Sequence, residues 1–167
     1  GDEVATDTVG TEFFEGGPGF EYHNDPGKTA GSYNKHGWST LGDIGYVDAD
    51  DYLYLTDRRA FMIISGGVNI YPQEAENVLV THPAVYDAAV IGVPNAEYGE
   101  EVKAVVQPVD PNRAGPELAA ELIAYCRAHL SPVKCPRSVD FEPHLPREAN
   151  GKLYKQDIRK RYWPSPA

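Results

Sequence analysis

The chain has 167 residues, of which 41% are hydrophobic, so it is long enough for one domain with a real core or for one domain and part of another. Its net charge of −10 argues against a nucleic-acid partner, because neutralising phosphates requires a basic face. No apolar run of membrane-spanning length and no signal-peptide pattern is present, and the sequence therefore predicts a cytoplasmic protein without a membrane span.

Residues 1–57 are rich in glycine and in turn-forming residues, and they contain short aromatic runs. The clearest element is a strand over 52–56, where aromatic and aliphatic side chains alternate after the acidic turn at 48–51. Breakers at 16–19 and 25–27 interrupt the rest. This part has too few core residues for a complete domain, so we expect it to be the end of a larger one.

Residues 58–167 are predicted to fold by themselves. A short apolar strand, a Ser-Gly-Gly turn and a second short strand lead to a helix that opens with Pro72. Ala75, Val78 and Leu79 lie on one stripe of that helix, and we interpret His82 as a residue at its end rather than as a ligand. The run 85–93 is apolar on both alternations, which predicts a central strand covered on both faces.

The remaining elements complete a small sheet with helices packed on it. An alternating run at 102–107 predicts a neighbouring strand, and a helix is expected from Pro116 with an apolar residue at every fourth position up to Leu130. Ser138–Phe141 is expected to be a strand and 155–162 a closing helix. Cys126 and Cys135 show no paired spacing, which indicates reduced structural thiols, and the scattered histidines predict no metal site. The fold class is therefore α+β.

Three segments have the composition of ligand sites. In 37–46, Asp43 lies between glycines in a tight turn, where its carboxylate could accept hydrogen bonds from a ribose diol or close an Asx turn. In 145–153, a loop shaped by a proline and a glycine presents Lys152, either to a phosphate or carboxylate or simply to solvent. The third segment, 56–76, holds a charged junction and the double-glycine turn.

In this order, and together with 90–94 (VIGVP) and 98–100 (YGE), these segments resemble the C-terminal portion of the adenylate-forming superfamily. That superfamily includes acyl-CoA synthetases, firefly luciferase and nonribosomal peptide adenylation domains. The run 63–74 is most similar to fatty or aromatic acyl-CoA ligases. The resemblance implies that 1–57 is the β-rich end of a large AMP-binding N-terminal domain. It also implies that 58–167 is the mobile C-terminal AMP-binding domain, with a small mixed sheet.

The resemblance also implies roles for single residues. It implies that Lys152 is the catalytic lysine and that the nucleotide ligands are Asp43, Arg58 and Asn69. It also implies that the turn lining the pantetheine tunnel consists of Ser65, Gly66 and Gly67, and that the hinge lies at Arg59 and Ala60. Alternative interpretations are a surface ion pair for Arg58, a turn-stabilising amide for Asn69 and an ordinary hairpin for the glycines. Relatives usually carry aspartate or lysine at the position of Ala60, so a charged hinge contact is not expected here.

The resemblance implies a ligase that uses ATP, AMP and CoA on a carboxylic acid. Magnesium, the adenine pocket and the phosphate-gripping loop would belong to the missing N-terminal domain, which is also the expected partner of this chain, and the chain alone is expected to be inactive. Anionic ligands would meet four cations, Arg58, Arg59, Lys152 and Lys155. Two alternatives stay open: an adenylation domain that loads a carrier-protein phosphopantetheine, and a non-catalytic α+β binding module.

Overall fold

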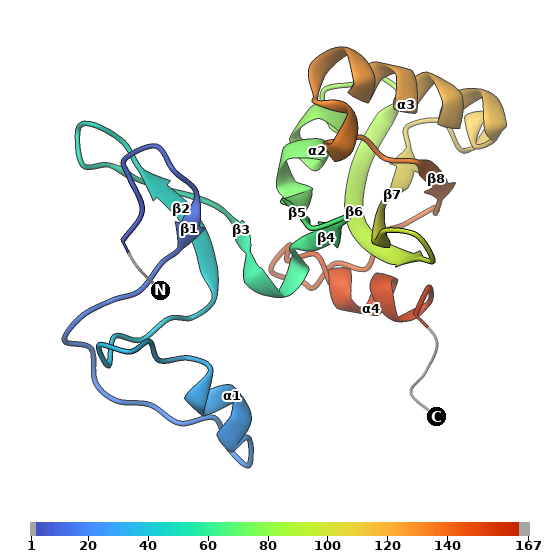
Figure 1. Cartoon of the computed structure of the whole chain (residues 1–167). Helices are drawn as coiled ribbons and strands as arrows, with labels where there is room; N and C mark the ends of the chain where they lie inside the picture. The colour runs from blue at the N-terminus through green and yellow to red at the C-terminus, as the bar shows by residue number, and fades with distance from the viewer. Residues whose placement is uncertain (1–2, 164–167) are drawn as a thin grey trace. The chain divides into compact units, whose positions relative to one another are not determined.

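The computed structural model describes residues 3–163, and the chain divides into two compact units, Gly1–Ala60 and Phe61–Ala167. Figure 1 shows both units with their helices and strands. The boundary lies a few residues after the one expected at 57/58. Each unit has its own secondary structure and is described by itself.

The first unit is a small antiparallel sheet with long connections. Its elements are β1 (Gly10–Thr11), α1 (Pro26–Ala30), β2 (Asp43–Val47) and β3 (Leu53–Arg58), and the strand order is β1-β2-β3. Tyr46 and Tyr54 are cross-strand partners whose rings stack with centroids 5.0 Å apart. Among the described residues of this unit, Ile44 is the one buried aliphatic side chain of the sheet, whereas Leu53 and Leu55 are exposed. The predicted scarcity of core residues is thus observed.

Helix α1 was not predicted, because the segment 25–27 was interpreted only as a chain breaker. The side chain of Asp25 accepts a hydrogen bond from the amide of Lys28, and Pro26 occupies the first helical turn. An aspartate cap followed by proline is a helix-start signal as much as a turn signal. The local sequence alone does not distinguish a helix start from a turn at these residues.

The second unit contains a five-stranded mixed sheet with helices packed on it. Its elements are β4 (Ile63–Ser65), β5 (Val68–Ile70), α2 (Pro72–Leu79), β6 (Val85–Asn95), β7 (Gly99–Pro108), η2 (Pro111–Arg113), α3 (Pro116–His129), η3 (Pro132–Lys134), β8 (Ser138–Phe141) and α4 (Lys155–Lys160). The short helix η1 (Arg59–Phe61) spans the boundary between the two units. The predicted α+β class is confirmed. Helix α2 begins at Pro72 and α3 at Pro116, as expected from a proline in the first turn.

Strand β6 is not central, and that prediction is wrong. The strand order is β5-β4-β7-β6, with β8 parallel to β7, so β7 is the central strand and β6 lies at an edge. The prediction failed because β6 is buried on both faces although only one of its edges is paired. Side chains cover the other edge: Glu76 accepts a hydrogen bond from the amide of Val90 at 2.7 Å, and Trp163 donates one to the carbonyl of Gly92 at 2.9 Å. Covering an edge in this way prevents further strand pairing there.

Two hydrophobic clusters share the alternating residues of β6. Ala88 and Val90 pack in the cluster that holds the buried residues of α2 and α3, while Ala89 and Ile91 pack with Ile158 of α4. Burying side chains of this size stabilises the fold by roughly 1.5–3 kcal/mol for each large aliphatic residue. Helix α4 is thereby attached to the sheet immediately after the loop that carries Lys152.

The remaining structural expectations concern His82 and the cysteines. His82 is buried just after α2, and its Nδ1 accepts a hydrogen bond from the amide of Ala84, which confirms its structural interpretation. Cys126 and Cys135 are both free and buried, as predicted. Within residues 3–163, no helix has the length and apolar character needed to cross a membrane.

Candidate functional site

Lys152 directly follows the tight turn at 148–151, which joins two short antiparallel arms. Arg147 and Leu153 pair as an isolated bridge, and the amide of Tyr154 donates to the carbonyl of Pro146 at 2.8 Å. Gly151 has φ = +84°, a conformation that favours glycine, so the glycine allows the chain to reverse directly before the lysine. The predicted shaped loop is therefore present.

The side chain of Lys152 is exposed, while its backbone is fixed. The amide of Lys152 donates to Asn150 Oδ1 at 2.9 Å, and its carbonyl accepts from the amide of Glu148 at 2.9 Å. Glu148 also accepts a hydrogen bond from the Tyr154 hydroxyl at 2.6 Å. This bond, a second one from Asn150 and the charge of Lys152 hold the pKa of Glu148 below its usual value. The lysine thus lies beside an ionised carboxylate on a hydrogen-bonded loop.

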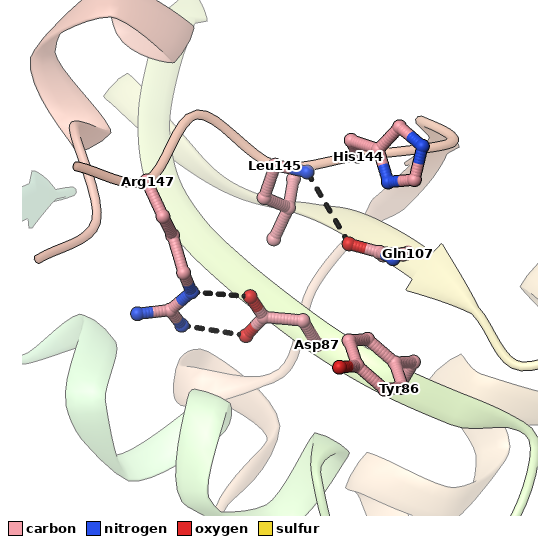
Figure 2. Close-up of a pocket in the computed structure, with 6 residues that line it drawn as sticks. All are labelled: Tyr86, Asp87, Gln107, His144, Leu145 and Arg147. Carbon is pink, nitrogen blue, oxygen red and sulfur yellow. Dashed lines mark hydrogen bonds and ion pairs between the residues drawn. The ribbon is translucent and has the colours of Figure 1, made fainter. Parts of the chain in front are cut away.

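Arg147 connects this loop to the sheet, a contact that sequence reasoning missed. Its Nε and Nη2 donate to the two carboxylate oxygens of Asp87 at 2.6 and 2.7 Å, and its Nη1 donates to the carbonyl of Gly151 at 2.6 Å. Figure 2 shows the paired bonds between Arg147 on the loop and Asp87 on β6. Asp87 is the only charged residue in the apolar run 85–93, which was the available signal.

An open hollow of about 500 Å³ adjoins this contact (Figure 2). Its lining comes from the strands and from the loop: Tyr86, Asp87, Gln107, His144, Leu145 and Arg147. The amide of Leu145 donates to Gln107 Oε1 at 3.4 Å, and the Leu145 side chain is buried in the cluster under α4. The hollow therefore marks where the loop leaves the sheet, and Leu145 fixes the loop at that end.

The double-glycine turn joins β4 to β5 as a two-residue hairpin loop. Gly66 and Gly67 have φ values of +56° and +81°, which is the requirement of a type I′ turn. A Cβ on Gly66 would lie 3.2 Å from the ring of Tyr98, whereas a Cβ on Gly67 would meet nothing within 4 Å. Ser65 before the turn is buried, and Asn69 after it is exposed. The turn thus has one tightly packed glycine and one facing open space.

Asp43 and Arg58 are cross-strand partners in the first unit. The guanidinium Nε of Arg58 lies 3.1 Å from Asp43 Oδ1, with side-chain exposures of 54% for Arg58 and 24% for Asp43. The structure therefore brings together two of the three expected nucleotide ligands, as an ion pair. Both side chains keep exposed surface, so the pair is accessible to a ligand.

The predicted hinge residues are exposed and lie at the boundary between the two units. The short helix η1 contains both Arg59 and Ala60. The amide of Arg59 donates to the carbonyl of Gly42 at 2.8 Å, and Gly42 directly precedes Asp43. The boundary between the units falls after Ala60.

Lys155 does not belong with the ligand-binding cations, and that expectation is wrong. Lys155 is 7% exposed, and its Nζ lies 2.8 Å from Glu76 Oε1 inside the second unit. The sequence placed this lysine close to Lys152 but could not show that the first turn of α4 directs it inward. For residues 3–163, no cluster of at least three His, Cys, Asp or Glu side chains could hold a metal ion.

Comparisons with known proteins identify the domain. Residues 74–152 match the family described as the AMP-binding enzyme C-terminal domain. The second unit is therefore the C-terminal domain of an AMP-binding enzyme, in agreement with its α+β sheet and its exposed lysine loop. The chain as a whole corresponds to the C-terminal portion of an adenylate-forming enzyme, and the curated relatives below are named as a CoA synthase and a CoA ligase.

Over 128 residues the chain is 45% identical to a feruloyl-CoA synthase of Amycolatopsis sp, which covers 77% of this chain and 26% of that protein. Over 142 residues it is 39% identical to a long-chain-fatty-acid–CoA ligase of Mycobacterium tuberculosis, with 85% of this chain and 27% of that protein covered. The chain thus spans about a quarter of the length of the curated relatives it matches.

Solved structures agree with this assignment. ATP-bound MatB from Rhodopseudomonas palustris has a TM-score of 0.80 at 32% identity, over 97% of this chain and 32% of that one. The amide bond synthetase McbA from Marinactinospora thermotolerans has a TM-score of 0.77 at 35% identity, over 97% of this chain and 32% of that one.

Proposed function

We propose that this chain is part of an enzyme that activates a carboxylic acid with ATP and transfers the resulting acyl group from an acyl-adenylate to CoA. The observation that carries the proposal is the exposed Lys152, held on a hydrogen-bonded loop within the segment that matches AMP-binding C-terminal domains. The named relatives act with CoA on aromatic and fatty acids, and their names support the same class of substrate here. The protein would act in the cytoplasm.

Lys152 would act in the first half-reaction, in which a carboxylate attacks the α-phosphate of ATP. Negative charge accumulates on the pentavalent phosphate, and a lysine placed there stabilises the transition state more than the ground state. At about 4 Å and an effective dielectric near 20, one such contact is worth roughly 4 kcal/mol before desolvation. Removing it would cost about 100- to 1000-fold in rate, since each 1.36 kcal/mol corresponds to tenfold.

The nucleotide would be held by three further residues. Asp43 would accept hydrogen bonds from the ribose hydroxyls, and the planar guanidinium of Arg58 would face the ribose and phosphates. Their mutual ion pair orients both groups before a ligand arrives. Asn69, exposed on β5, would contact the phosphate of AMP. Magnesium would enter with ATP and be bound by protein outside this chain.

The second half-reaction would use a different face of the domain. Ser65, Gly66 and Gly67 would line the path of the pantetheine thiol, and the open space beside Gly67 is compatible with a ligand passing there. One arrangement of the domain cannot both hold Lys152 at the phosphate and admit a thiol from the opposite face, so we propose that the domain rotates between the two steps about Arg59 and Ala60. The boundary of the two units after Ala60 supports that pivot.

The acceptor of the acyl group is the least constrained part of the proposal. The likeness to an amide bond synthetase is as high in sequence as the likeness to MatB, so an amine acceptor is a specific alternative. A carrier-protein phosphopantetheine and a non-catalytic binding module are the others. An assay in which a purified acyl-adenylate is offered CoA, an amine or a pantetheinylated carrier protein separates these alternatives.

The decisive experiment restores the upstream domain and measures pyrophosphate exchange with a panel of aromatic and aliphatic carboxylic acids. The isolated chain should show no exchange, and the restored enzyme should exchange with at least one acid. Lys152→Ala should lower exchange by about 100-fold or more, while thioester formation from a supplied acyl-adenylate should change far less.

The matched control is Lys160→Ala, which removes an exposed lysine of α4 that pairs with Asp157. It should leave both half-reactions close to wild type. Retention of full exchange in Lys152→Ala would refute the catalytic assignment. An equal loss in both half-reactions would refute the rotation of Lys152 away from the site.

A further inference from the structure

We infer that the ion pair of Arg147 and Asp87 positions Lys152. The position and direction of the lysine are then set by strand β6 and not by the loop alone. This inference rests on the proposed role of Lys152. Arg147 is a positioning residue in this scheme, because its guanidinium acts through Gly151 and not on the substrate.

The guanidinium of Arg147 uses all three of its nitrogens within the protein. Two of them bind the two oxygens of Asp87 (Figure 2). The third binds the carbonyl of Gly151, the residue directly before Lys152. A planar guanidinium holds these three acceptors at fixed angles to one another, which a lysine at 147 could not do. The position of the peptide group between Gly151 and Lys152 is therefore fixed relative to the carboxylate of Asp87.

Asp87 provides a rigid base for this contact. It lies in β6, which is paired with β7 along nearly its whole length, and its side chain is 13% exposed. Its Oδ1 also accepts a hydrogen bond from the amide of Ala88 at 2.9 Å. An acid that is paired and hydrogen-bonded in this way has little rotamer freedom left. The hydrogen bond to Asp87 also raises the pKa of Arg147.

The loop is attached to the rest of the second unit at a second point, after Lys152. At the far end, Lys155 is held by Glu76, and Ile158 is fully buried under the sheet. Between these fixed points, the loop is closed by backbone bonds and by the hydrogen bond of Tyr154 to Glu148. Those bonds keep the shape of the loop, but they do not fix its direction relative to the sheet. Arg147 supplies that direction.

A misplaced lysine would be costly, because electrostatic stabilisation of a transition state depends on preorganised geometry. A displacement on the order of 1 Å caused at a distance can lower a rate by about 100-fold. Arg147→Gln and Asp87→Asn should each lower the kcat of adenylation by about 10- to 100-fold, with smaller changes in the KM for ATP and acid. Thioester formation from a supplied acyl-adenylate should stay within about twofold.

The first measurement is hydrogen exchange on the 167-residue chain, which needs no catalysis. Arg147→Gln and Asp87→Asn should both speed exchange in the peptide that spans 148–154, while the peptides of α3 and β7 should stay unchanged. The matched control is Arg113→Gln, which breaks the exposed 2.7 Å ion pair with Glu121. That control should leave the 148–154 peptide as it is in the wild type.

The second measurement is the kinetic split in the restored enzyme, with Arg147→Lys as a conservative variant. Lysine keeps the attraction to Asp87 but cannot hold Asp87 and Gly151 together, so it should recover only part of the lost kcat. The inference fails if Arg147→Gln shows wild-type hydrogen exchange at 148–154 and wild-type adenylation while Lys152→Ala is inactive. The proposed function then still stands. If Lys152→Ala is itself active, the proposed function falls first. If Arg147→Gln lowers both half-reactions equally, the pair stabilises the fold and does not position Lys152.

Discussion

Lys155 and Glu76 form an ion pair inside the second unit, with Nζ and Oε1 2.8 Å apart and side-chain exposures of 9% and 7%. The same Oε1 accepts the amide hydrogen of Val90 on the unpaired edge of β6. One carboxylate thus connects α2, the edge strand and the first residue of α4. The ring of Phe61 lies 5.5 Å from the ammonium group, which is within the range of a cation–π contact.

Removing one member of this pair should destabilise the second unit strongly. Lys155→Ala removes the cation that lies 2.8 Å from the buried Glu76 carboxylate, and breaking a buried pair in this way costs about 3–5 kcal/mol. Replacing both residues, as in Glu76→Gln with Lys155→Met, should cost less than the sum of the two single changes. Urea unfolding followed by the emission of Trp163 in a Trp38→Phe background measures this difference.

The control for this series is again Lys160→Ala, because its partner Asp157 is exposed. Exposed ion pairs contribute about 0.2–1 kcal/mol, so this variant should unfold close to the wild type. A loss below about 1 kcal/mol in Lys155→Ala would mean that the buried pair contributes no more than an exposed one.

The cysteines should be chemically inert in the folded chain. Burial, together with the neighbouring Cys135, raises the pKa of Cys126 to about 11, and burial also raises the pKa of Cys135. The thiolate is the reactive form, so at pH 8 only about one Cys126 in a thousand is reactive even where reagent can enter. A disulfide-exchange reagent should therefore label neither cysteine within minutes at pH 8, and both in urea. Rapid native labelling of either would contradict the burial seen here.

The local signals in the sequence were reliable wherever one residue decides the backbone. Pro72 and Pro116 begin helices, and Gly66 and Gly67 form the hairpin turn, because ring closure and the missing Cβ act on φ without reference to the rest of the chain. The lysine loop was predicted for the same reason, from a proline and a glycine at its two sides.

The long-range contacts could not be predicted in the same way. β6 was expected in the centre of the sheet because both of its faces are apolar, yet its free edge is covered by side chains of Glu76 and Trp163. Lys155 was counted with the ligand-binding cations, although the helix turns it towards Glu76. Each of these contacts joins residues far apart in the chain, so no local pattern indicates it.

Gly67→Leu should separate the two half-reactions if the turn lines the pantetheine path. A leucine side chain there would extend into the open space beside the turn, where a Cβ meets nothing within 4 Å. Pyrophosphate exchange should stay close to wild type, whereas thioester formation from a supplied acyl-adenylate should fall sharply. Both rates are measured on the same preparation of the restored enzyme.

The φ of +81° at Gly67 means that any side chain introduces backbone strain of about 1–3 kcal/mol. Gly67→Ala introduces a similar strain with much less bulk, and it should keep most of the thioester activity. If Gly67→Ala and Gly67→Leu lose that activity equally, strain and not obstruction is the cause. A collapse of pyrophosphate exchange in both variants would show that the turn is needed only for folding.

Ala60→Pro tests the proposed pivot at the boundary between the two units. Proline fixes φ near −65° and disfavours the helical region for Arg59, so the backbone at this point could not follow a large rotation. One half-reaction should survive and the other should fail, depending on which arrangement proline permits. Ala60→Asp introduces a residue type expected at this position from the resemblance, and it should cost little, because rotation requires backbone freedom rather than a charge. Pyrophosphate exchange and thioester formation, measured separately in both variants, decide the matter. Near-native rates of both steps in Ala60→Pro would place the pivot outside Arg59 and Ala60.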